Sequence, residues 1–141
     1  MQNETVREIK AIMDYLGKAD WETIDGDTLV RAQGKLAAYQ GNLSELVNAA
    51  RKESELTKVN VKKLESEKYL EYRNSGETSK DSEINAAVDA LESRMRALDV
   101  EERYLYLKGL LDALQSLTVA CQVALREKRS ERFNSGYVEN A

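Results

Sequence analysis

The stretch that decides the fold is residues 82–132, SEINAAVDALESRMRALDVEERYLYLKGLLDALQSLTVACQVALREKRSER. In its first half, apolar residues recur at alternating steps of four and three, at Ile84, Val88, Leu91, Met95 and Leu98. An α-helix turns once per 3.6 residues, so this spacing places the five side chains on one stripe. The pattern predicts one long helix with a partner helix along that stripe.

The second half of the stretch, from Tyr104 to Leu125, is apolar on more than one side. Its apolar positions include Leu107, Leu110, Leu111, Leu114, Leu117, Cys121 and Leu125. A helix that is apolar all round must be covered on several sides, and one antiparallel neighbour cannot do that. We therefore expect these seven residues to form the interface of a homo-oligomer.

The composition favours a single all-α domain. The chain has 141 residues and no proline, and 33 % of its residues are charged while only 6 % are aromatic. This profile is typical of long helices with much exposed surface. The net charge of −4 argues against indiscriminate binding to polyanions, although residues 31–80 carry ten bases and seven acids. The charge balance therefore does not exclude that this part of the chain binds a polyanion.

The residues before this stretch predict a short helix, an acidic loop and a second long helix. An apolar face over residues 6–16 predicts a short helix that ends near Gly17, and Trp21 is expected to anchor the loop that continues to residue 27. The second long helix is expected over residues 28–73, capped by Asp27 or Thr28. Its partner-facing seam is Leu29, Ala32, Leu36, Tyr39, Leu43, Leu46 and Ala50.

Two polar segments predict where the long helices end. Residues 74–81 contain nothing apolar and should form the tip of a hairpin, after which Asp81 or Ser82 caps the helix over residues 82–132. Asn-Ser-Gly recurs at 134–136, so residues 133–141 are expected to be a mobile tail. The expected architecture is a long antiparallel helical hairpin with a short N-terminal helix, oligomerising through its C-terminal helix.

The residue types argue against catalysis and against a membrane protein. The chain has no His, and its single Cys121 has no base beside it to activate a nucleophile. No phosphate-binding loop, zinc spacing or calcium loop is present, so we expect a non-enzymatic binding or assembly protein without metal or cofactor. An unpaired cysteine, no secretion signal and no uninterrupted apolar span predict a soluble intracellular protein.

The one segment with interaction chemistry is the end of the second helix. It combines bases and tyrosines at Lys58, Lys62, Lys63, Lys68, Tyr69, Tyr72 and Arg73. Lysines hold phosphates and tyrosines stack on bases, so this set predicts a site for single-stranded DNA. Glu65, Glu67 and Glu71 stand at pairing distance from the same bases. From these residues alone, a salt-bridged helix surface is the favoured interpretation.

A family resemblance adds a role to this segment. Residues 68–76, KYLEYRNSG, resemble the segment that ends the basic helix of UvsY-type recombination mediators of tailed bacteriophages, where bases run into Leu-Asp-Tyr-Tyr-Ser-Gly. Upstream, residues 29–46 are similar to the first long helical stretch of that family. Downstream, residues 105–124 are similar to its apolar C-terminal helix, including Leu-Leu-Asp at 110–112. The similarity covers residues 28–130 in length and order.

The resemblance implies a DNA recombination mediator that also serves DNA repair and replication in the cytoplasm of a bacterial host cell. Such a protein binds single-stranded DNA and loads a RecA-like recombinase onto strands covered by single-strand binding protein. It forms a ring, a hexamer or heptamer. Lys68 matches one DNA-contacting base of the family, but Glu67 and Tyr69 stand where further bases would be expected. The alternative is a coiled-coil assembly or adaptor protein that binds no nucleic acid.

Overall fold

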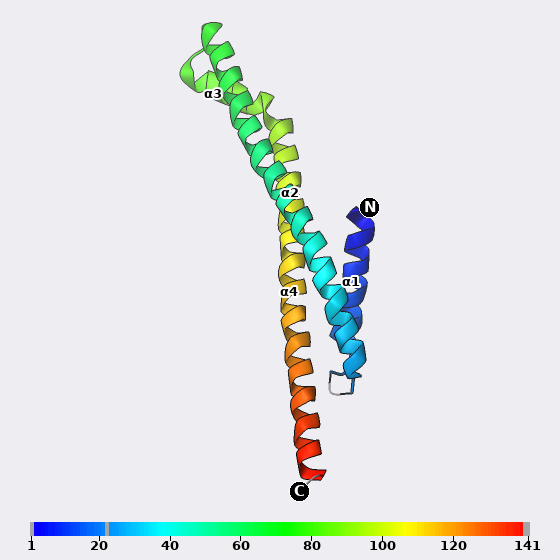
Figure 1. Ribbon diagram of the computed structural model, residues 1–141. Helices are drawn as coiled ribbons and strands as arrows, with labels where there is room; N and C mark the ends of the chain where they lie inside the picture. Colours follow the sequence, from blue (N-terminus) through cyan, green and yellow to red (C-terminus); the bar gives the residue numbers. More distant parts are fainter. Residues whose placement is uncertain (1, 22, 140–141) are drawn as a thin grey trace. The chain divides into compact units, whose positions relative to one another are not determined.

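The computed structural model describes residues 2–21 and 23–139, and within them it contains four helices (Figure 1). They are α1 (Gln2–Lys18), α2 (Gly26–Asn74), α3 (Ser79–Asp89) and α4 (Leu91–Glu139). The predicted all-α fold, with a short first helix and a long second one, is confirmed. The predicted helix over residues 82–132 is instead two helices, and α4 continues to Glu139 where a tail was expected. Residues 140 and 141 of that tail lie outside the described residues.

The chain divides into two compact units, each containing packed helices. Unit 1 is Met1–Leu46 together with Gly109–Ala141, and unit 2 is Val47–Lys108. Unit 1 therefore contains α1, the first part of α2 and the last part of α4. Unit 2 contains the rest of α2, all of α3 and the first part of α4.

The core of unit 1 is built from three helices. Its fully buried side chains are Ile9 and Leu16 from α1, Leu29, Leu36 and Leu43 from α2, and Leu114 and Cys121 from α4. Tyr39 of α2 donates a hydrogen bond of 3.3 Å to Glu8 of α1, and the Cys121 thiol donates one of 3.4 Å to the Leu29 carbonyl. The predicted apolar faces of α1 and of the first part of α2 are confirmed.

This core changes the interpretation of the predicted oligomer interface. Leu114, Cys121 and Leu125 are buried within unit 1, and Leu107 is buried within the chain as part of unit 2. The argument from uncovered apolar surface does not apply to these four residues. It still applies to Leu110, Leu111 and Leu117, which are half-buried. Oligomerisation through this part of α4 stays a prediction.

Unit 2 is an antiparallel pairing of α2 with α3 and α4. Lys58 forms an ion pair of 2.9 Å with Glu101, Glu65 pairs with Arg94, and Tyr72 bonds Asp89. Because residue numbers rise along α2 while those of its partners fall, the two sides run in opposite directions. The predicted antiparallel hairpin is thus present within unit 2.

The hairpin turns at a glycine in the left-handed backbone region. Gly76 has a φ of 91°, which glycine adopts without the clash that a Cβ would create. The Gly76 amide donates to the Arg73 carbonyl at 3.1 Å, and the Glu77 amide donates to the Tyr72 carbonyl at 3.2 Å. This pair of bonds is the Schellman arrangement that satisfies the last carbonyls of a helix. The predicted turn at Asn74-Ser75-Gly76 is confirmed.

The cap of the next helix differs from the prediction. Thr78, rather than Asp81 or Ser82, is the N-cap of α3, and its hydroxyl accepts a 3.2 Å hydrogen bond from the Asp81 amide. The spacing of a threonine and an acid three residues later is a start signal that the sequence contains. At Ala90 the backbone has φ −90° and ψ 0°, which separates α3 from α4.

Between residues 79 and 97, the buried residues of α3 and α4 in unit 2 are small, whereas Leu107 further along α4 is large and also buried. Ser82, Ala86, Ala90 and Ala97 are buried there. The predicted stripe points the other way, because its five large side chains are between 53 % and 63 % exposed. Together with Leu105, which is 54 % exposed, they form what we call the outer stripe, which is Ile84, Val88, Leu91, Met95, Leu98 and Leu105. α2 therefore does not cover this stripe in unit 2, and a partner helix along it stays a prediction. Large apolar residues and small residues recur at helical spacing on opposite sides of this part of the chain. The side with the small residues is the one that allows α2 to approach closely.

Candidate functional site

The predicted binding segment borders two adjoining hollows on the surface of unit 2. One has a volume of about 420 Å³, and we call it the lysine groove. It is lined by Lys58, Val61, Lys62, Glu65, Arg94, Ala97, Leu98 and Glu101. The other has a volume of about 570 Å³ and lies nearer the tip of the hairpin. The two hollows share Glu65 and Arg94, so they are neighbours on the surface between α2 and the α3–α4 side.

The lysine groove has more positive than negative charge. Three bases and two acids line it, and both acids are engaged, because Glu101 pairs with Lys58 and Glu65 pairs with Arg94. Lys62 is exposed and has no hydrogen bond or ion pair among the described residues. Between the charges the floor is apolar, formed by side chains such as Val61 and Ala97. An anionic ligand with flat apolar groups fits this combination.

The hollow near the tip has the opposite balance. Glu65 and Glu83 line it together with one base, Arg94, and the remaining lining is small or apolar apart from Ser66 and Tyr69. Two carboxylates beside a single guanidinium disfavour a phosphate by like-charge repulsion. Electrostatics therefore favour the lysine groove over the tip hollow as the place for an anionic strand.

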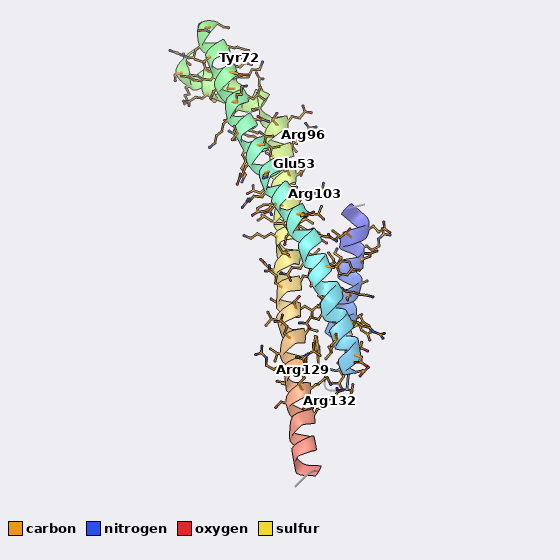
Figure 2. All side chains as sticks on the ribbon, in the orientation of Figure 1. Glu53, Tyr72, Arg96, Arg103, Arg129 and Arg132 are labelled. Carbon is orange, nitrogen blue, oxygen red and sulfur yellow. The ribbon has the colours of Figure 1, made fainter. Side chains whose placement is uncertain are left out.

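The two predicted stacking tyrosines join α2 to α3 by hydrogen bonds. The Tyr69 and Ser79 hydroxyls lie 3.1 Å apart, and the Tyr72 hydroxyl donates to the Asp89 carboxylate at 2.5 Å. The hydrogen bond to Asp89 is also the main cause that raises the pKa of Tyr72 above its ordinary value of 10.0. Figure 2 shows Tyr72 at the end of α2 beside α3. Both tyrosines thus brace the tip of the hairpin.

The seven predicted residues do not form one surface. Lys58 and Lys62 line the lysine groove, whereas Lys63 and Lys68 line neither hollow. Lys68 pairs with Glu71 on its own helix at 3.2 Å, and Arg73 donates to the Glu77 carbonyl at 3.1 Å, which holds the turn. Lys63 is exposed and has no partner in the part of the chain that the structure describes.

Sequence reasoning missed Arg94, the third base of the lysine groove. Arg94 lies 29 residues from Glu65 and reaches it only because α4 folds back along α2. The available signal was the hairpin register, since a turn at residues 74–78 brings these two positions of the opposing helices together. Spacing along a single helix cannot supply that information.

The described residues also constrain other chemistry. They contain no group of three metal-ligating side chains close together. Cys121 is buried, and burial raises the pKa of its thiol, so the reactive thiolate form is disfavoured near neutral pH. Within the same residues, no helix combines the length and apolarity that crossing a bilayer requires.

Comparisons with known proteins give no relative to guide the assignment. No family model matches the chain, and neither a curated protein nor a solved structure matches it. The candidate site therefore stands on its geometry and charge, together with the resemblance at residues 68–76.

Proposed function

We propose that this protein binds single-stranded DNA in the lysine groove and acts as a recombination mediator. The observation that carries the proposal is three bases, Lys58, Lys62 and Arg94, around an apolar floor in one groove. Bases of this kind hold backbone phosphates, and an apolar floor accommodates the faces of nucleotide bases. The groove lies on packed helices, so the backbone positions that carry its three bases are fixed relative to one another.

The ion pairs in the groove do not block this role. The Lys58 side chain is 51 % exposed and its partner Glu101 is 35 % exposed. Exposed pairs of this kind contribute only about 0–1 kcal/mol to stability. A phosphate can therefore replace Glu101 as the partner of Lys58 at little cost, while Lys62 is already without a partner among the described residues.

The mediator role rests on the resemblance rather than on the groove. It assigns the protein a part in DNA recombination, repair and replication, with a RecA-like recombinase and single-strand binding protein as partners. A homo-oligomer would present several grooves to one strand, and linked sites raise overall affinity without any new contact. This is how a groove with one surplus positive charge could hold DNA despite a net charge of −4.

A salt titration of binding to a labelled oligo-dT strand tests the proposal. The double variant Lys58→Ala/Lys62→Ala should bind more weakly than wild type, and its salt slope should flatten by about 1.4, because each lost contact to a single strand removes about 0.7. The matched control is Lys63→Ala/Lys68→Ala, which removes the same charge from the same helix outside the groove. It should keep the wild-type slope.

Two outcomes would decide against the lysine groove. Equal losses of affinity in the two variants would mean that binding depends on the overall charge of α2 and not on the groove. An absence of wild-type binding at low salt would replace the mediator role with the second candidate, a helical assembly or adaptor protein. The observation that favours this second candidate is the bonding of Tyr69, Tyr72 and Lys68 within the chain. Circular dichroism of both variants checks that the helices are intact.

A further inference from the structure

Another hollow lies in unit 1, whereas the lysine groove belongs to unit 2. It has a volume of about 310 Å³, and we call it the arginine hollow. It is lined by Gln33, Gln122, Leu125, Arg126 and Arg129. Gln33 comes from α2 and the other four residues come from α4. Figure 2 shows Arg129 on the last part of α4.

The arginine hollow lies beside a buried contact between its two helices. There the Cys121 thiol of α4 donates a hydrogen bond of 3.4 Å to the Leu29 carbonyl of α2. Gln33 stands one turn beyond Leu29 on α2. Gln122 directly follows Cys121 on α4. Packing in the core of unit 1 therefore fixes the backbone on both sides of the hollow.

The polar side chains of the arginine hollow are all hydrogen-bond donors, and none of the four has a hydrogen bond or ion pair among the described residues. In unit 2, by contrast, Arg73 and Arg94 bond oxygens of the chain itself. The described lining of the hollow contains no carboxylate. The acids of this part of α4, Glu127 and Glu131, line a separate hollow with Trp21. Two guanidiniums thus share a hollow that no acid of the described chain neutralises.

We propose that the arginine hollow binds the phosphate group of a small phosphate monoester. A guanidinium is a planar fork of donors that matches the oxygens of a phosphate. Arg126 and Arg129 are three residues apart on one helix, so they are neighbours that can contact the same group. The amides of Gln33 and Gln122 can donate to the remaining phosphate oxygens.

Charge and size favour a monoester over other anions. A phosphate monoester carries a charge of about −1.5 to −2 at pH 7, which balances two guanidiniums, whereas a carboxylate or one phosphodiester carries a single negative charge. The volume of the arginine hollow is at the lower end of the range for small-molecule sites, about 300–1,000 Å³. A phosphate group fills only part of it, which leaves room for a small organic group attached to the phosphate.

Calorimetric titration of the full chain with dTMP, beside thymidine, tests the proposal. The wild type should bind dTMP and not thymidine. Arg126→Gln/Arg129→Gln should bind dTMP about 100-fold more weakly, because each lost charge-assisted contact costs about tenfold. The matched control is Lys128→Gln/Arg132→Gln, which removes the same charge from the same part of α4 outside the hollow. At about 0.1 M salt, exposed charges more than about 10 Å apart are largely screened, so the control should keep the wild-type affinity.

A second variant separates the hollow from the charge of α4. Gln33→Ala removes no charge and comes from the other helix, and it should weaken dTMP binding by about fivefold through one lost hydrogen bond. The arginines that are replaced in the first variant are exposed, so every variant should keep the wild-type circular dichroism. Lys58→Ala/Lys62→Ala, which tests DNA binding in the lysine groove, should leave dTMP binding unchanged. The two proposals can therefore fail separately.

Four results would overturn the phosphate site. They are no binding of dTMP by the wild type at millimolar concentration, equal binding of thymidine, wild-type affinity in Arg126→Gln/Arg129→Gln, and an equal loss of affinity in the control. A further result would reassign the hollow: if Arg126→Gln/Arg129→Gln weakened binding of an oligo-dT strand without terminal phosphates as much as binding of dTMP, the hollow would hold a DNA strand, and the proposal of a small monoester would be wrong.

Discussion

Replacing Leu114 by alanine should destabilise unit 1 without changing the mass of the protein. Leu114 is fully buried among helices of its own chain. Burial of this kind makes Leu→Ala cost about 2–5 kcal/mol, part of it for lost transfer energy and part for the cavity. Three helices can close partly around the gap, so we expect a value of about 2–3 kcal/mol. Urea unfolding followed by circular dichroism measures it.

The matched control is Val119→Ala, five residues further along the same helix. Val119 is 57 % exposed, so its truncation removes little buried area, and alanine regains about 0.5 kcal/mol of helix propensity. Its stability should stay within about 0.5 kcal/mol of wild type. The reasoning is refuted if Leu114→Ala costs less than about 1 kcal/mol, or if it lowers the mass measured by light scattering. The second result would restore Leu114 to an interface between copies.

Three further predictions concern single contacts. Tyr72→Phe should loosen the tip of the hairpin, seen as faster hydrogen exchange of the α3 amides, because it removes the bond to Asp89. The raised pKa of Tyr72 means that its bond stabilises the fold below pH 10 and is lost as the pH rises through the folded-state value. Asp89→Asn should therefore move part of the tyrosinate absorbance titration to lower pH, and an unchanged titration curve would contradict the bond. Cys121 should react with a thiol reagent only at the rate of unfolding, and rapid labelling of the native protein would show that the core of unit 1 is open.

The sequence predicted the fold correctly where the residues that recur at helical spacing on the buried side are also the large apolar ones. Along the first part of α2, the large residues Leu29, Leu36 and Leu43 are also the buried ones. Along α3 and the start of α4, the buried residues are small, so the apolar period indicated the wrong side. Period alone identifies two opposite stripes of a helix, and packing decides which of them is inside.

Whether a short sequence motif ends a helix also depended on its surroundings in the fold. Asn-Ser-Gly occurs at 74–76 and at 134–136, but only the first ends a helix. At Gly76 the chain turns back, and the following helix packs against the one before it. The second copy lies within α4, where a glycine costs only about 1 kcal/mol relative to alanine. The same three residues are therefore a turn in one context and part of α4 in the other.

The candidate site shows the same division between local and long-range information. The one-turn spacing of Lys58 and Lys62 was visible in the sequence, and the two lysines do share a groove. Arg94 could not be assigned to that groove without the register of the hairpin. The sequence assigned Tyr72 to base stacking. Its hydrogen-bond acceptor, Asp89, lies on the opposing helix and could not be identified without the register of the hairpin. Side chains that act across a hairpin need the register before their roles can be argued, and here the turn at Gly76 sets that register.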